Sequence, residues 1–108
     1  MDDQEFRNQA DQALEGLFAR LAGSAGDDDF EGELNQGALT VEIEKTHERF
    51  VVSPNSPVHQ IWVSALTRSF KLEWDATRGA FVHPETQQTL EELVIWAIRT
   101  RIGSQFKV

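Results

Sequence analysis

The sequence has 108 residues and a net charge of −8, with 40% apolar residues, three tryptophans and no cysteine. This length predicts one domain over residues 1–108, and the apolar content argues against disorder. The lack of cysteine excludes disulfides, thiolate metal sites and thiol catalysis. No export signal and no apolar run of membrane-spanning length is present, so we expect a cytoplasmic protein without membrane contact.

Residues 3–22 carry apolar side chains at three- and four-residue steps, which predicts a helix with one apolar stripe. From residue 30 the apolar side chains alternate with polar ones, which predicts strands. The expected strands cover residues 30–34, 39–44, 50–52, 58–64 and 70–74, with a sixth starting at 81. Ser53–Pro57 is expected to break the third strand. Residues 87–102 return to the helical period, with Thr89 and Glu92 as a capping box. The short connections predict an α+β, two-layer α–β sandwich, in which both helices cover one face of an antiparallel sheet of about six strands.

The charge is uneven along the chain. Residues 1–48 hold 13 acidic and 3 basic side chains, whereas residues 49–108 hold 5 acidic and 7 basic ones. An acidic half disfavours contact with a phosphate backbone and favours a hard cation or a basic partner surface. The bases of the second half are scattered, so we expect no nucleic-acid binding. Acidity that serves solubility alone is the open alternative.

Residues 26–37, which read Gly-Asp-Asp-Asp-Phe-Glu-Gly-Glu-Leu-Asn-Gln-Gly, concentrate the carboxylates. An EF-hand loop starting at Asp27 would need a bidentate ligand where Ala38 stands, so a calcium loop is disfavoured. Phe30 and Leu34 are in phase with the core, so Glu31 and Glu33 point outward, roughly 7 Å apart. They repel by about 0.6 kcal/mol in water, which a cation would relieve. An edge strand protected by charge is the competing interpretation.

Trp62 is predicted to lie on the open face of the sheet. Ile61 and Val63 are in phase with the core, which leaves Trp62 beside Gln60 on the other side. An exposed tryptophan among polar groups is a common interface anchor. The alternatives are that a loop or Arg68 covers Trp62, or that the phase is wrong. No nucleophile motif, phosphate loop or histidine pair is present, so we expect no enzyme activity.

Three segments resemble the frataxin family, and most closely its bacterial CyaY branch. They are Glu5-Phe6 with Ala10-Asp11-Gln12, residues 33–40 (Glu-Leu-Asn-Gln-Gly-Ala-Leu-Thr), and residues 57–64 (Pro-Val-His-Gln-Ile-Trp-Val-Ser). The order of the expected elements also agrees along essentially the whole chain. The resemblance implies weak binding of iron, Fe(II) or Fe(III), by carboxylates, with other divalent cations as alternatives. It also implies docking on a cysteine desulfurase and an iron–sulfur scaffold protein, as a regulator of cluster assembly.

Carried over by position, the resemblance assigns two sets of residues. The metal-binding set is Asp27, Asp28, Asp29, Glu31 and Glu33, with Asp3, Asp11 and Glu15 from the first helix. The partner-binding set is Trp62, Gln60, Asn55 and Arg68. Two segments depart from the family pattern: residues 21–26 at the end of the first helix lack acids, and Ser53-Pro54-Asn55 replaces a polar Asn-x-Gln. We expect a monomer that iron could drive into oligomers. An iron-storage or ferroxidase-type enzyme and a metal-free acidic interaction domain remain alternatives.

Overall fold

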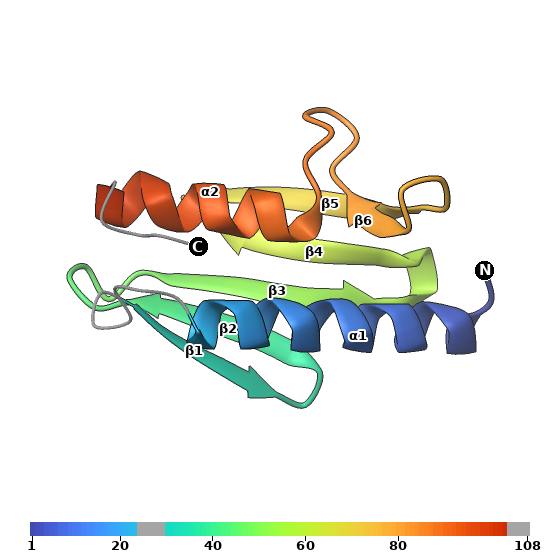
Figure 1. Cartoon of the computed structure of the whole chain (residues 1–108), viewed down its shortest axis with the longest axis horizontal. Coiled ribbons are helices and arrows are strands. Elements are labelled where there is room, and N and C mark those ends of the chain that lie inside the picture. The colour runs from blue at the N-terminus through green and yellow to red at the C-terminus, as the bar shows by residue number, and fades with distance from the viewer. Residues whose placement is uncertain (24–29, 104–108) are drawn as a thin grey trace.

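The computed structural model describes residues 1–23 and 30–103 (Figure 1). Two helices and six strands form the molecule, with a short 3-10 turn between the third and fourth strands. They are α1 (Asp3–Ala22), β1 (Phe30–Asn35), β2 (Ala38–Ile43), β3 (Arg49–Asn55), η2 (Ser56–Val58), β4 (Gln60–Ala65), β5 (Arg68–Asp75), β6 (Ala80–Val82) and α2 (Leu90–Ile102). The predicted α–β sandwich is confirmed.

The sheet is an antiparallel meander in which the strands lie in chain order, from β1 at one edge to β6 at the other. Both helices lie side by side across the same face (Figure 1). The strand residues facing the helices are buried, for example Leu39, Val52, Ile61 and Leu72, each 0% exposed. The helices add their apolar stripes, from Phe6 to Leu21 in α1 and from Leu90 to Ile98 in α2. The opposite face of the sheet is mostly polar, with Val51 and Trp62 as its exposed large apolar residues.

Both helices begin at capping residues that the sequence indicates. Asp2 caps α1, because its Oδ1 accepts the backbone N–H of Glu5 at 2.8 Å. In α2, Thr89 and Glu92 form the predicted capping box. A hydrogen bond from the Thr89 backbone N–H lowers the pKa of Glu92; burial opposes this shift, and the Thr89 hydroxyl and Arg78 add smaller lowering effects. The helix starts at Leu90, so the prediction of residue 87 was three residues early.

The third and fourth strands differ from prediction around Pro54. We expected residues 53–57 to break β3, yet β3 continues to Asn55, with Pro54 paired to Ile61 of β4. The pairing of β2 with β3 ends at Val52, so Pro54 has a strand on one side alone, where sheets accept a proline. Val58 belongs to η2 rather than to β4. The fifth strand is longer than predicted at both ends.

Candidate metal and partner-binding surfaces

The acids of α1 occupy two different places. Around the helix, Arg20 faces α2, where it binds Glu91 at 2.6 Å, whereas Phe18 faces β1 and lies 3.8 Å from the Cβ position of Gly32. Asp11 and Glu15 precede Phe18 by seven and three residues, so they lie on the β1 side of α1. Both are exposed. They can therefore contribute to a carboxylate surface at the β1 edge.

Asp3 lies at the other end of α1 and already has a partner. Its Oδ1 is 2.7 Å from Nε2 of His59, which has a left-handed backbone between η2 and β4. The His59 ring stacks on Phe6, with ring centroids 5.2 Å apart. A helix of this length spans about 30 Å, so Asp3 is far from the segment that follows α1. The structure does not bring Asp3 together with the acids near residue 27.

Glu31 and Glu33 lie on the open face of β1, as predicted, and both are exposed. Their strand partners are Glu42 and Thr40 of β2. Glu42 is partly neutralised by Arg49, which approaches one carboxylate oxygen at 3.6 Å, while Nδ1 of His47 lies 3.3 Å from the other oxygen. Glu31, Glu33, Thr40, Glu42 and Arg49 border a shallow hollow of about 360 Å³. Its oxygen atoms suit hard cations, but the hollow is open and its charge is partly balanced.

The predicted residues Asp27, Asp28 and Asp29 lie outside the described residues. Over residues 1–23 and 30–103, no three histidine, aspartate or glutamate side chains gather closely enough to hold a metal ion. Among the described residues, Glu31 and Glu33 lie on the open face of β1 beside Glu42, and Asp11 and Glu15 lie on the β1 side of α1. Such a surface would bind a cation weakly, because no closed ligand set encloses the ion.

Trp62 stands on the open face and is 39% exposed, as the strand phase predicted. Its indole Nε1–H donates to Oε1 of Gln60 at 3.0 Å, and the Gln60 amide donates to Glu73 at 3.2 Å. Lys71, directly opposite Trp62 in β5, holds its ammonium 5.0 Å from the indole ring. These contacts hold the exposed indole in one orientation, and an interface residue that is already ordered would lower the entropy cost of binding.

Asn55 and Arg68 are placed differently from one another. Asn55 pairs with Gln60 across β3 and β4, so it borders the Trp62 surface. Arg68 pairs with Ala65, which is buried, and its guanidinium lies 4.9 Å from the Phe70 ring. The structure therefore places Arg68 on the helical side of the sheet, away from Trp62, and Lys71 takes the position beside the indole. A prediction of a two-residue turn at Leu66–Thr67 would have given the pairing of Trp62 with Lys71. The predicted fourth and fifth strands were too short at this turn to show it.

An acidic α–β sandwich with carboxylates at one sheet edge and a fixed tryptophan on its open face is the class of protein that the structure defines. A family model described as the frataxin-like domain matches residues 1–104. A solved frataxin from Psychromonas ingrahamii, a model for stability modulation within the CyaY protein family, shares the fold with a TM-score of 0.74 and 22% identity. The match covers 94% of this chain and 91% of that one. The chain belongs to the frataxin family.

Neither α1 nor α2 is both long and apolar enough to cross a bilayer.

Proposed function

We propose that this chain is an iron-binding accessory protein of iron–sulfur cluster assembly that regulates a desulfurase–scaffold complex and has no active site of its own. Membership of the frataxin family over residues 1–104 is the observation that carries this proposal. In this proposal, two surfaces on the same sheet carry the binding of iron and of the partner proteins. One is the carboxylate edge of β1, and the other is the Trp62 surface, formed by Trp62, Gln60, Lys71, Asn55 and Ser53.

Iron binds at the carboxylate edge in this proposal. Glu31 and Glu33 supply outward oxygens from β1, Asp27, Asp28 and Asp29 precede them in the chain, and Asp11 with Glu15 approach from α1. Carboxylates in an open array bind hard cations with modest affinity and little selectivity, so Fe(II), Fe(III) and other divalent ions would compete. Asp3 would contribute only after releasing His59. In this proposal the bound iron is either a cargo that the protein carries or a signal that it senses.

The partners dock through both surfaces. The acidic edge would steer a basic groove of the cysteine desulfurase, since like-signed carboxylates on a rigid strand project a focused field. The Trp62 surface supplies an aromatic anchor for the desulfurase–scaffold assembly, because its indole is large, exposed and held in one orientation. The protein would act in the cytoplasm as a monomer, with oligomers forming only when iron bridges the edges of different molecules.

A two-dimensional NMR titration tests the proposal. Fe(II) is added first, in the absence of oxygen, and then the cysteine desulfurase with its scaffold protein. We expect iron to perturb the amides of Glu31 and Glu33, and the partners to perturb these amides together with the indole N–H of Trp62. Lack of any change at both surfaces would overturn the proposal. Faster Fe(II) oxidation with the protein than without it would support the storage enzyme instead.

A further inference from the structure

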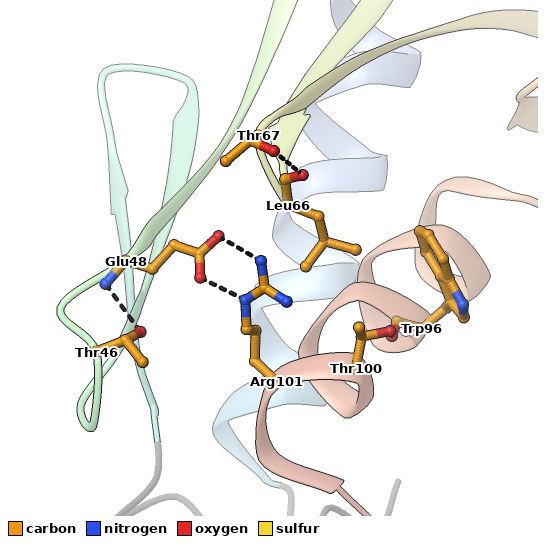
Figure 2. Close-up of polar contacts among 7 residues, drawn as sticks. All are labelled: Thr46, Glu48, Leu66, Thr67, Trp96, Thr100 and Arg101. Atoms are coloured by element: carbon orange, nitrogen blue, oxygen red, sulfur yellow. Dashed lines mark hydrogen bonds and ion pairs between the residues drawn. The ribbon is translucent and has the colours of Figure 1, made fainter.

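A second exposed tryptophan lies on the helical side of the molecule. Trp96 projects from α2 and is 38% exposed, almost as much as Trp62 on the other side of the sheet. Its ring meets the buried ring of Phe70 edge-on, with centroids 6.2 Å apart. In Figure 2, Trp96 points away from the side of α2 on which Arg101 reaches Glu48. The indole therefore rests on the core through one edge and leaves much of its surface to solvent.

Two arginines border this indole. Arg68 stacks on the same Phe70 ring, at 4.9 Å from its centroid. Arg99 follows Trp96 by three residues, so it is a neighbour on the exposed side of α2. Trp96, Phe70, Arg68 and Arg99 together form what we call the Trp96 surface. Beside it lies a hollow of about 500 Å³, lined by Trp96, Arg99 and Ile95 together with Arg20, Thr89, Glu91 and Glu92.

The carboxylates near α2 are already bound by other arginines. Three ion pairs account for them: Arg20 with Glu91 at 2.6 Å, Arg78 with Glu92 at 3.7 Å, and Arg101 with Glu48 at 2.5 Å. Within the described residues, neither Arg68 nor Arg99 approaches a carboxylate closely enough for an ion pair. The Trp96 surface therefore carries an excess of positive charge on a protein whose net charge is −8.

We propose that the Trp96 surface binds an acidic segment of a partner protein, with carboxylates on Arg68 and Arg99 and an apolar side chain against the Trp96 indole. Tryptophan and arginine are the residues that most often dominate binding energy at interfaces, and Arg68 is pre-ordered by its stacking on Phe70. A nucleic acid is disfavoured, because its phosphates would be repelled by the acidic half of the molecule. This docking site needs no iron and lies on the side of the sheet opposite to Trp62.

The test uses the full chain and a synthetic probe, a short Glu-rich peptide with one leucine. The indole N–H signal of Trp96 is assigned by its loss in Trp96→Phe and is followed as peptide is added. We expect this signal to shift and to return as salt is raised, while that of Trp62 stays in place. Replacing both arginines (Arg68→Gln and Arg99→Gln) should weaken binding about fourfold to 25-fold, if the two ion pairs together are worth about 0.8–1.9 kcal/mol next to an aromatic ring.

Matched controls make the result decisive. Arg7→Gln removes an exposed charge from α1 and should leave peptide binding unchanged, whereas Arg68→Lys should restore part of the loss. A peptide with every Glu replaced by Gln should bind more weakly than the Glu-rich peptide. Equal binding of both peptides, a larger shift with a short single-stranded oligonucleotide, or a shift caused by protein concentration alone would each overturn the proposal.

Discussion

Trp62 shows how a single residue can be ordered without being part of the core. Its ring is exposed, yet Gln60 holds the indole nitrogen and Lys71 covers one ring face. An aromatic side chain of this kind contributes less to stability than a core aromatic, because 39% of its surface stays in contact with solvent. Its hydrogen bond and its contact with Lys71 hold the exposed ring in one orientation.

Replacing Trp62 by alanine should separate folding from binding. We expect Trp62→Ala to change the free energy of unfolding by no more than about 1 kcal/mol, because the residue is on the surface. Affinity for the desulfurase–scaffold complex should fall by about 2 kcal/mol or more. Urea unfolding and calorimetric titration measure the two effects. Val58→Ala, at an exposed apolar residue of η2, is the control, and a large loss of stability in Trp62→Ala would contradict the surface role.

Glu92 makes a pH-dependent contribution to stability. Its pKa is lowered in the folded protein, mainly by the hydrogen bond from the Thr89 backbone N–H. The contribution is therefore present above the pKa of the unfolded chain and is lost as pH falls through the lower folded value. Because Glu92 is largely exposed, we expect a modest effect of about 0.3–1 kcal/mol.

The variant Glu92→Gln tests this dependence, since glutamine keeps a capping side chain without the charge. It should be less stable than the parent protein near pH 7, and thermal unfolding at a series of pH values should show this difference in stability shrinking as the pH falls through the lowered folded pKa of Glu92. Glu85→Gln, at an exposed glutamate of the turn before α2, should show no such convergence. If the difference in stability between Glu92→Gln and the parent protein stays constant with pH, the charge of Glu92 is not the cause of that difference.

At the scale of elements, the two tight hairpins have the same left-handed loop conformation but form it with different residues. The β1–β2 loop has Gln36 and Gly37 at φ 54° and 80°, and the β4–β5 loop has Leu66 and Thr67 at φ 56° and 59°. Two-residue hairpins with positive φ at both positions favour asparagine and glycine, because a Cβ atom is crowded there. Thr67 is β-branched and exposed, so its side chain contributes strain and little packing.

Thr67→Gly should therefore stabilise the protein. We expect a gain of about 0.5–1 kcal/mol, the relief of left-handed strain less the extra chain entropy of glycine. Differential scanning calorimetry would record a higher melting temperature. Thr67→Ala keeps the Cβ atom and should gain less. If glycine lowers the melting temperature, the Thr67 hydroxyl bond to the Leu66 carbonyl is worth more than the strain (Figure 2).

Alternation and capping residues were sufficient to predict most of these elements, including the outward direction of Glu31 and Trp62. The errors lie where the backbone depends on distant neighbours. Pro54 was taken as a strand breaker, but the end of β2 beside it makes a proline acceptable. Arg68 was grouped with Trp62 because the end of β5 was unknown, and its face follows from pairing with Ala65. The bond of Asp3 to His59 spans 56 positions, and no local pattern indicates it.

At the scale of the whole molecule, charge and aromatic anchors are divided between surfaces. The open side of the sheet carries the carboxylate edge at β1 and Trp62 further across, whereas the helical side carries Trp96 and Arg68, both of which contact the Phe70 ring. The sheet separates the two tryptophans, so the two proposed docking surfaces do not overlap.

Neutralising the carboxylate edge should affect iron and partner binding together. We expect Asp27→Asn, Asp29→Asn, Glu31→Gln and Glu33→Gln, combined, to remove most iron-induced NMR shifts. The same variant should slow association with the desulfurase about tenfold at low salt, because electrostatic steering is lost. Stopped-flow association and iron titration measure these effects. The pair Glu5→Gln and Glu85→Gln is the control, and an unchanged iron titration would show that the edge is not the metal site.

The position of β1 at the edge of a meander has a consequence for local opening. β1 pairs with β2 and has no sheet neighbour on its other side among the described residues, so its amides should exchange with solvent sooner than those of β3 and β4. The strand that carries Glu31 and Glu33 is thus one of the two edge strands, and it should open more readily than the strands at the centre of the sheet. A cation or partner bound to β1 would suppress this local opening. Amide hydrogen exchange in β1 should then be slower with the ligand bound, while the exchange rates of β3 and β4 should not change.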